Sequence, residues 1–268
     1  MTLTEFQPHM QLAGVATAMV LLAMGITWFV ARALNNFGIV DAAWSFLFAP
    51  VAALYAVLGT GNIDRRVVVI GMVAFWSIRL GTHLTRRIYR EHPKEDRRYA
   101  ALRDEWGIRV DSRMLGFYLL QGLVIVVLSL PYLLPVFNSD SAIHPLELVG
   151  IGIFLTGLCG ESLSDSQLVR FKAENLAADA VCETGLWRHS RHPNYFFEWL
   201  IWIGFATFAL PSPAGWLGLI APALMLHFLL NVTGIPMAEE LAVARKGDAY
   251  RRYQQTTSRF IPWLRKET

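Results

Sequence analysis

The chain has 268 residues, of which 54% are hydrophobic and only 17% are charged, and its formal net charge is +3. Soluble domains carry about 25% charged residues, and the mean hydropathy of this chain is +0.38. The composition therefore excludes an ordinary soluble domain and favours a polytopic membrane protein. Two cysteines, Cys159 and Cys182, are too few to indicate a disulfide framework or a metal site.

Apolar runs long enough to cross about 30 Å of hydrocarbon recur along the chain. They predict about seven transmembrane helices, at 12–32, 38–60, 66–84, 115–136, 146–163, 194–211 and 214–234. Six or eight helices stay open, because the sixth and seventh runs are joined only by 210–213. The first run lacks the cleavage site of a signal peptide, so we expect it to be retained as a helix. The expected fold is all-α, a single membrane domain over residues 1–268.

Lysine and arginine residues predict the orientation, because short basic loops stay on the cytoplasmic side. Residues 86–113 contain nine Lys and Arg, whereas residues 138–144 contain none. With seven helices, the N-terminus lies outside and the C-terminus, with its basic tail, lies in the cytoplasm. Arg65 and Arg66 oppose this orientation, since they fall on the outer side.

A polar motif at 185–198 stands directly before an apolar run. Its polar members are Arg188, Arg191, His192, Asn194, Tyr195 and Glu198. The basic side chains can bind a phosphate or another anion, the amide and phenol can hydrogen-bond a polar group, and a carboxylate at the edge of a membrane needs a partner. The motif therefore indicates a ligand site.

A second polar stretch continues the apolar run that ends at 163. Glu161, Asp165 and Lys172 fall on one helical stripe, which places two carboxylates and a cation on one face. A solvated helix face would show the same pattern. However, Glu161 lies only two residues beyond Cys159, where a carboxylate is costly unless it faces the bundle interior. We expect this stripe to bind ribose or amide groups and phosphate.

The residues from 239 to 263 form a third constellation, predicted as an amphipathic helix followed by an extended end. Tyr250 and Tyr253 are about one turn apart, and they could stack on a nucleobase or lie at the lipid interface. For Trp263 the interfacial position is the simpler expectation.

The motif at 185–198 and the C-terminal tail together resemble the signature of a known family. Arg191-His192-Pro193-Asn194-Tyr195, with Glu198 and the tail from 239 to 262, resembles the steroid 5-alpha-reductase superfamily, most closely a bacterial branch of it. The C-terminal half is also similar to the sterol C14 and C7 reductases and to isoprenylcysteine methyltransferases. The resemblance covers about 150–268 well, and the N-terminal half only in helix count and spacing.

The resemblance implies an NADPH-dependent reductase of a lipophilic enone or unsaturated lipid that enters from the bilayer. It implies a bacterial inner membrane with the cofactor site facing the cytoplasm, substrate-side helices at 1–136 and a cofactor-binding half at 146–268. A nucleic-acid partner is not expected. The implied cofactor-binding residues are Glu161, Asp165, Lys172, Arg188, Arg191, His192, Asn194, Tyr195, Glu198, Glu240, Tyr250 and Tyr253.

The substrate side departs from the family. Steroid 5-alpha-reductases hold the ketone with a Gln-Glu pair on the second helix and a Tyr on the third, and neither the Glu nor the Tyr stands at the matching places here. Instead Asp41 lies on the second run, and Arg79 and His83 lie four residues apart on the third. Arg79 or His83 could polarise a carbonyl while Asp41 orients it. Alternatively, Asp41 and Arg79 only neutralise each other, and His83 reaches toward the cytoplasm.

Two other functions stay open. A similar motif serves S-adenosylmethionine binding in isoprenylcysteine and phospholipid methyltransferases, although the longer polar stretch at 161–172 suits a dinucleotide better. A membrane binding protein without catalysis would also explain the missing Glu and Tyr. No glycine-rich dinucleotide fingerprint accompanies the site residues.

Overall fold

The computed structural model describes residues 3–174, 177, 179–232 and 234–266. The described chain is helical, and within it the only β-type pairing is an isolated bridge between Ser190 and Ser258. This confirms the predicted all-α class. The chain divides into two compact units, the first formed by Met1–Ile143 and Ala209–Gly218, the second by His144–Phe208 and Leu219–Thr268. The prediction of one membrane domain is left open by this division.

Six described helical segments are long and apolar enough to cross a bilayer, which makes the chain a polytopic membrane protein. They are Phe6–Ala33, Ile39–Leu58, Ile63–Glu91, Arg97–Leu128, Pro145–Glu174 and Gly215–Lys246. The predicted span at 194–211 forms a shorter helix, α8, of 17 residues. At 1.5 Å per residue it extends about 26 Å, slightly less than the hydrocarbon thickness. The seventh crossing and the orientation therefore stay predictions.

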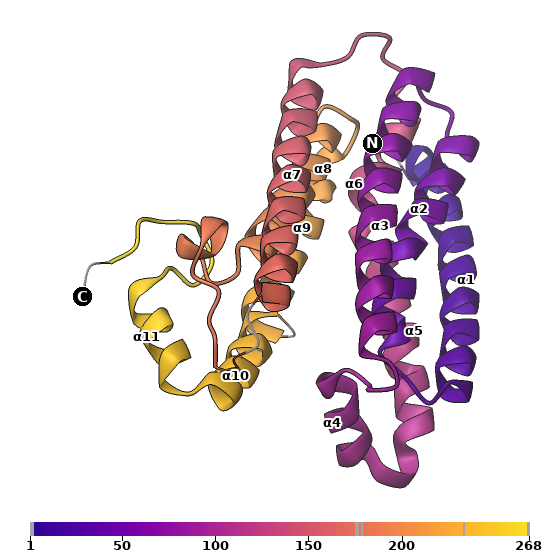
Figure 1. Cartoon of the computed structure of the whole chain (residues 1–268). Coiled ribbons are helices and arrows are strands. Elements are labelled where there is room, and N and C mark those ends of the chain that lie inside the picture. The colour runs from indigo at the N-terminus through magenta and orange to yellow at the C-terminus, as the bar shows by residue number, and fades with distance from the viewer. Residues whose placement is uncertain (1–2, 175–176, 178, 233, 267–268) are drawn as a thin grey trace. The chain divides into compact units, whose positions relative to one another are not determined.

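The first unit is a bundle of antiparallel helices (Figure 1). Its helices are α1 (Leu3–Ala33), α2 (Ile39–Leu58), α3 (Ile63–Glu91), α4 (Arg97–Trp106), α5 (Val110–Leu128) and α6 (Leu130–Leu133). Helix α2 packs against α1 and α3, and α1 packs against α5. The centre contains large side chains that are almost completely buried, among them Trp76, Tyr55 and Tyr118. In a membrane bundle such side chains stabilise the interior through close packing, because lipid tails are as apolar as the interior itself.

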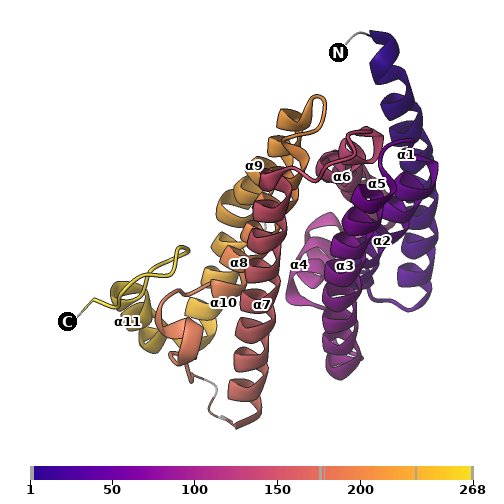
Figure 2. The same ribbon diagram turned by 90° about the horizontal axis from the view of Figure 1, so that it is seen from above.

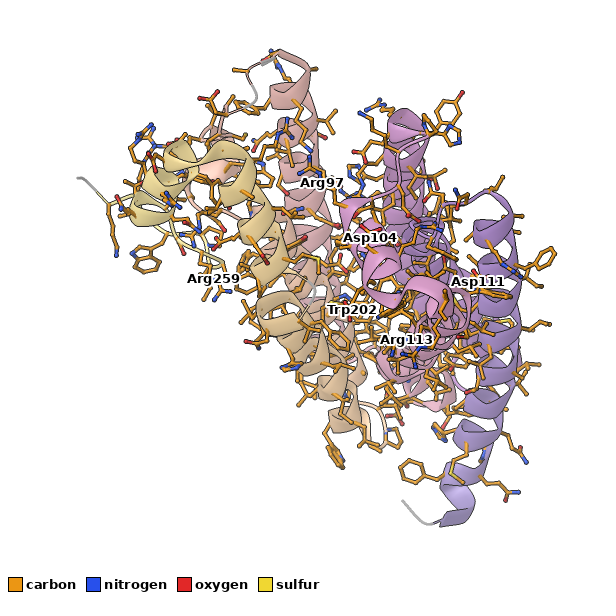
Figure 3. The ribbon with its side chains drawn as sticks, turned by 90° about the horizontal axis from the view of Figure 1, so that it is seen from below. Arg97, Asp104, Asp111, Arg113, Trp202 and Arg259 are labelled. Atoms are coloured by element: carbon orange, nitrogen blue, oxygen red, sulfur yellow. The ribbon has the colours of Figure 1, made fainter. Side chains whose placement is uncertain are left out.

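Helix α4 was not predicted, because its sequence is polar and lies within the basic stretch 86–113. It begins at Arg97 after an N-cap by Asp96, whose carboxylate accepts from the Arg98 amide. Figure 3 labels Arg97 and Asp104 in α4, and Asp111 and Arg113 in the first turn of α5. The basic stretch 86–113, called the elbow below, is thus ordered and is not an irregular loop.

A proline inside α2 explains why α2 and α3 pack so closely. Pro50 has no N–H and disturbs the preceding turn of the helix. The Ser77 hydroxyl of α3 repairs this turn, because its oxygen is 2.6 Å from the Ser45 carbonyl, to which it donates, and 3.2 Å from the Ala49 amide, from which it accepts. The backbone groups of α2 around the interruption are therefore hydrogen-bonded by a side chain of the neighbouring helix α3.

Arg65 and Arg66, which opposed the predicted orientation, cap backbone carbonyls. Arg65 is 2% exposed and donates to the carbonyls of Asn138, Asp140 and Ala142, at 3.3, 2.7 and 2.7 Å. Arg66 donates to two carbonyls at the end of α2, at 3.0 and 2.8 Å. These charges tie loops together within the first unit, so their position has a structural reason that is independent of the loop-charge rule.

The second unit contains α7 (Pro145–Glu174), α8 (Pro193–Ala209), α9 (Ile220–His227), α10 (Ile235–Lys246) and α11 (Asp248–Thr256) (Figures 1 and 2). Helices α7 and α8 run antiparallel with their backbones in contact. A Cβ added at Gly150 would lie 2.9 Å from the Gly204 carbonyl, and one added at Gly204 would lie 2.9 Å from the Gly150 carbonyl. Small residues at such crossings are typical of membrane helices.

We predict that Ser77→Ala destabilises the protein by about 1–3 kcal/mol, because it leaves buried backbone groups of α2 without their partner. Thr85→Ala is the matched control, since the Thr85 hydroxyl bonds only to the Gly81 carbonyl of its own helix, at 2.7 Å. Thermal unfolding in detergent measures both. Equal melting temperatures for the two variants would contradict this account of the α2–α3 contact.

Candidate functional site

The polar motif is clamped onto α7 at its beginning. The Trp187 indole N–H donates to the Ser164 carbonyl at 2.9 Å, and the Leu186 amide donates to the Gln167 side chain at 2.9 Å. Gly185 has a φ of +58°, and a Cβ there would overlap the Gln167 side chain. A glycine is therefore required for the turn that brings the motif against α7.

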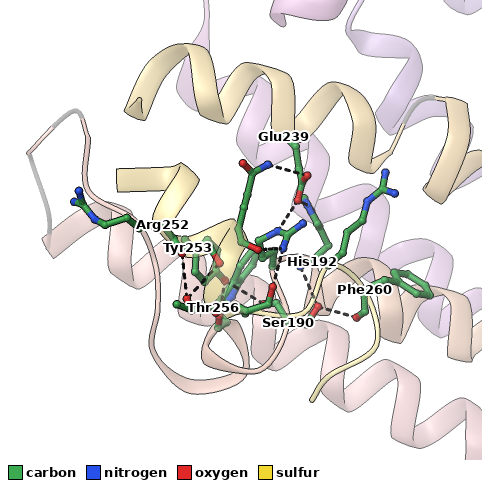
Figure 4. Close-up of polar contacts among 12 residues, drawn as sticks. Ser190, His192, Glu239, Arg252, Tyr253, Thr256 and Phe260 are labelled. Atoms are coloured by element: carbon green, nitrogen blue, oxygen red, sulfur yellow. Dashed lines mark hydrogen bonds and ion pairs between the residues drawn. The ribbon is translucent and has the colours of Figure 1, made fainter. Parts of the chain in front are cut away.

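Arg191 ties the motif to the C-terminal part of the chain (Figure 4). Its Nε lies 2.6 Å from a Glu239 carboxylate oxygen, and its Nη1 donates to the carbonyls of Gln254 and Thr257, at 2.9 and 2.7 Å. Its backbone amide also donates to the Ser258 carbonyl, at 2.8 Å. Three of the five guanidinium N–H groups thus serve contacts within the protein. This geometry gives Arg191 a structural role in addition to the predicted anion contact.

Glu239 is the centre of this cluster. Besides Arg191, it contacts His192 Nε2 at 3.3 Å and accepts from Gln254 Nε2 at 3.0 Å. Its neighbour Glu240, which the resemblance implies as a site residue, is exposed. Helical spacing does not separate the two glutamates, because an apolar residue stands one turn before each, Ile235 before Glu239 and Met237 before Glu240.

His192 is buried beside this carboxylate. Burial lowers the pKa of His192, and the Glu239 hydrogen bond and charge oppose that effect only in part. Its ring is stacked on Tyr195, with 5.5 Å between centroids and an interplanar angle of 9°. The His192 backbone amide donates to the Ser190 hydroxyl, which in turn donates to the Phe260 carbonyl at 2.7 Å. His192 is therefore held by side chain and backbone alike.

The two tyrosines of α11 are both buried, with 5% and 2% of Tyr250 and Tyr253 exposed. Burial raises the pKa of each phenol. The Tyr253 hydroxyl donates to the carbonyls of Trp187 and Ser190. Their burial corrects the expectation of a position at the lipid interface, and Tyr253 fastens α11 to the motif.

The α7 stripe and the motif meet at Asp165 and Asn194. The Asn194 amide nitrogen lies 3.4 Å from an Asp165 carboxylate oxygen, a long hydrogen bond between side chains that the sequence separates by 29 residues. Glu161 is buried one turn before Asp165. Glu198 is also buried and accepts from the Trp202 indole at 2.8 Å. The structure thus brings the two stretches into contact at Asp165 and Asn194, and buries Glu161 and Glu198.

The two remaining cations lie at the outer end of this arrangement. Lys172 is exposed near the end of α7, and Arg188 is exposed in the short 3-10 helix Gly185–Arg188. Both side chains are accessible to a negatively charged ligand. The second unit therefore has a buried, hydrogen-bonding part and a cationic, accessible part.

The three substrate-side residues belong to the first unit. The Asp41 carboxylate lies 2.5 Å from Arg98 Nη2 and accepts from the Tyr99 hydroxyl at 2.6 Å. The sequence predicts an ion pair between Asp41 and Arg79. In the structure, the ion-pair partner of Asp41 is Arg98 of α4, the helix that was not predicted. Arg79 and His83 are half-buried and share one face of α3, as their spacing predicted.

Around Asp41 the elbow forms a wider ion network. Arg98 also binds Asp96, with its Nε 3.0 Å from Oδ1, and Arg87 lies 3.1 Å from the same carboxylate and 3.6 Å from Asp41. The charge of Asp41 is therefore compensated by two arginines, which stabilises the elbow against the first turn of α2. Sequence reasoning could not select these partners among the nine basic residues of the stretch.

Comparison with known proteins gives a family but no function. Residues 27–257 match a family described as a protein of unknown function (DUF1295). An uncharacterized protein of Schizosaccharomyces pombe is 26% identical, over 89% of this chain and 76% of the yeast protein. No solved structure matches. The matched range includes every residue predicted for the site.

We predict that Glu239→Gln destabilises the protein by about 3 kcal/mol, because it leaves the buried Arg191 guanidinium without its counter-charge. Glu240→Gln removes the same charge from an exposed neighbour and should change the stability by less than about 0.5 kcal/mol. Thermal unfolding of both variants in the same detergent compares them. A Glu240→Gln effect as large as that of Glu239→Gln would contradict the assignment of the cluster to Glu239.

The lowered pKa of His192 predicts a pH dependence of stability. Below a pH of about 6.5 the unfolded chain binds a proton at His192 that the folded chain does not bind, so the stability falls as the pH drops from about 7 to about 5. His192→Gln should weaken this part of the dependence. Melting temperatures measured across the range test it, and parallel curves for wild type and variant would exclude His192 as the cause.

Proposed function

We propose a function for this chain, which belongs to the DUF1295 family of proteins of unknown function: it is a membrane-embedded, NADPH-dependent reductase of a lipophilic enone or related unsaturated lipid. The proposal rests on the resemblance of the motif at 191–198 and of the tail to the steroid 5-alpha-reductase superfamily. It also rests on the way these residues are arranged in the second unit.

The observation that carries the proposal is the contact between Asp165 and Asn194. It joins the polar stripe of α7 to the motif, so that a carboxylate and an amide meet at the beginning of α8. Hydrogen-bonding groups of this kind suit the hydroxyls of a ribose and the carboxamide of a nicotinamide. A purely solvated helix face would have no reason to bury Glu161 and Asp165.

The donor set also suits the charged part of NADPH. Lys172 and Arg188 are exposed and cationic, and Arg188 can meet a phosphate with two parallel N–H groups. The buried carboxylates lie on the inner side, where phosphate would be repelled. The expected binding mode therefore has the phosphates at the outer cations and the nicotinamide end at the inner polar groups.

The Arg191–Glu239 cluster supports this arrangement without needing to contact the ligand. Arg191 and His192 immediately precede the first turn of α8, which carries Asn194 and Tyr195. Fixing them to α10 and α11 fixes the direction in which Asn194 and Tyr195 project. Preorganised groups of this kind lower the cost of orienting a bound molecule.

When bound, NADPH would supply a hydride to the β carbon of the enone, and a proton completes the reduction to the saturated ketone. As part of the same proposal, Arg79 or His83 is the candidate that stabilises negative charge on the substrate oxygen. Asp41 would then act by holding Tyr99 and Arg98 in place.

We predict that Asn194→Ala and Arg188→Ala each weaken NADPH binding by about fivefold or more, equivalent to losing about 1 kcal/mol of hydrogen bonding. Arg252→Ala is the charge-matched control, because Arg252 is exposed on α11 outside the proposed site. Calorimetric titration of detergent-purified full-length protein measures the affinity. Unchanged affinity in both site variants would reject the assignment.

The same preparation distinguishes the other functions. Binding of S-adenosylmethionine without binding of NADPH would favour the methyltransferase and contradict the reductase. Binding of NADPH with no oxidation of it on a panel of lipophilic enones would favour a binding protein. The reductase requires both binding and enone-dependent oxidation.

A further inference from the structure

The C-terminal segment 260–266 is fastened to the second unit at its beginning. Phe260 is buried, and its ring centroid lies 5.7 Å from that of Phe196 and 5.8 Å from that of Trp199, both on α8. Its carbonyl accepts from the Ser190 hydroxyl (Figure 4). The segment therefore starts at a fixed point beside the first two turns of α8.

The backbone beyond Phe260 is also held. The Trp263 amide donates to the His189 carbonyl at 2.9 Å, and the Lys266 amide donates to the Thr256 carbonyl at 2.9 Å. A His189 ring nitrogen lies 3.3 Å from the Trp263 carbonyl. The course of this segment is thus set by hydrogen bonds to the motif and to α11.

The side chains on this ordered backbone face outward. Ile261, Trp263 and Leu264 are 56%, 72% and 77% exposed. Single exposed apolar residues are common. Three large ones within four positions of a segment whose backbone is held by hydrogen bonds form an apolar patch that needs a partner.

Two observations indicate what this partner is. The fixed point of the segment is the beginning of α8, an apolar helix whose run at 194–211 is predicted to cross the membrane, so the patch lies at the end of α8 that this prediction places at the membrane surface. Two exposed basic residues, Arg259 and Lys266, flank the patch in the sequence. Arg259 is labelled in Figure 3. The nearby carboxylate of Glu183 is paired with Arg265, so the acidic group is already compensated.

We propose that Ile261, Trp263 and Leu264 insert into the headgroup region of the membrane and that Arg259 and Lys266 bind the phosphates of anionic lipids. Tryptophan favours this region because its ring is amphipathic, and basic side chains are attracted to a negatively charged leaflet. The segment is then a lipid-binding surface that shares no residue with the proposed cofactor site.

A fluorescent probe at Leu264 tests the insertion. Cys159 is exposed and is replaced in a Cys159→Ala background, whereas Cys182 is buried, which raises the pKa of its thiol and slows its labelling. Leu264→Cys and the control Gln255→Cys, exposed on α11, are labelled in this background. The full chain is placed at one copy per nanodisc containing brominated lipid. We expect quenching at position 264 to exceed that at 255 by about threefold or more.

The lipid charge is the second arm of the experiment. Phosphatidylcholine discs are compared with discs that also contain phosphatidylglycerol, and quenching at position 264 should rise with the anionic lipid. The double variant Arg259→Gln/Lys266→Gln should remove this rise, while its melting temperature in detergent shows that it is folded.

Equal quenching at 264 and 255 would overturn the proposal. Quenching that does not depend on phosphatidylglycerol would also overturn it, because the basic residues would then have no role. A probe that becomes shielded only when two copies share a disc would show that a second chain covers the patch, and this result likewise contradicts the lipid-binding surface.

Discussion

The ion pair between Arg191 and Glu239 is the interaction on which the second unit depends. A buried guanidinium is costly unless a carboxylate and further acceptors compensate it, and here one carboxylate and two backbone carbonyls do so. Because the acceptors come from α10 and from the end of α11, the pair determines where both elements lie. The motif, the two helices and the tail are consequently one cooperative assembly.

The helices of the membrane part could be predicted from the sequence because hydrocarbon imposes a simple requirement on length and composition. The polar parts have no such requirement. Helix α4 is held by a local N-cap at Asp96 and by the ion pair of Arg98 with Asp41, and only this ion pair depends on a partner that is distant in sequence. The choice between Glu239 and Glu240 depended on which face of α10 is buried, and the sequence does not indicate this face, because apolar residues stand one turn before both glutamates.

The candidate site, too, could be predicted from the sequence only in part. Residue types and spacing singled out Asp165 and Asn194, which the structure brings into contact. They could not reveal that most N–H groups of the Arg191 guanidinium donate to other groups of the chain itself. A charged side chain in a polar motif looks the same in sequence whether it holds a ligand or a backbone carbonyl, and Arg65 is a further example.

The contact between the Arg191 amide and the Ser258 carbonyl has a consequence for the order of folding. During synthesis α7 and α8 are made well before residues 254–260, so the Arg191 side chain is in place before its acceptors from Gln254 and Thr257 exist. Until these residues are translated, the Arg191 guanidinium lacks its two backbone acceptors and has the Glu239 carboxylate of α10 as its partner. The second unit is therefore completed only after residue 257 has been made, and a chain that stops before residue 254 would keep the ion pair but lose the backbone contacts that fasten Arg191 to the end of α11.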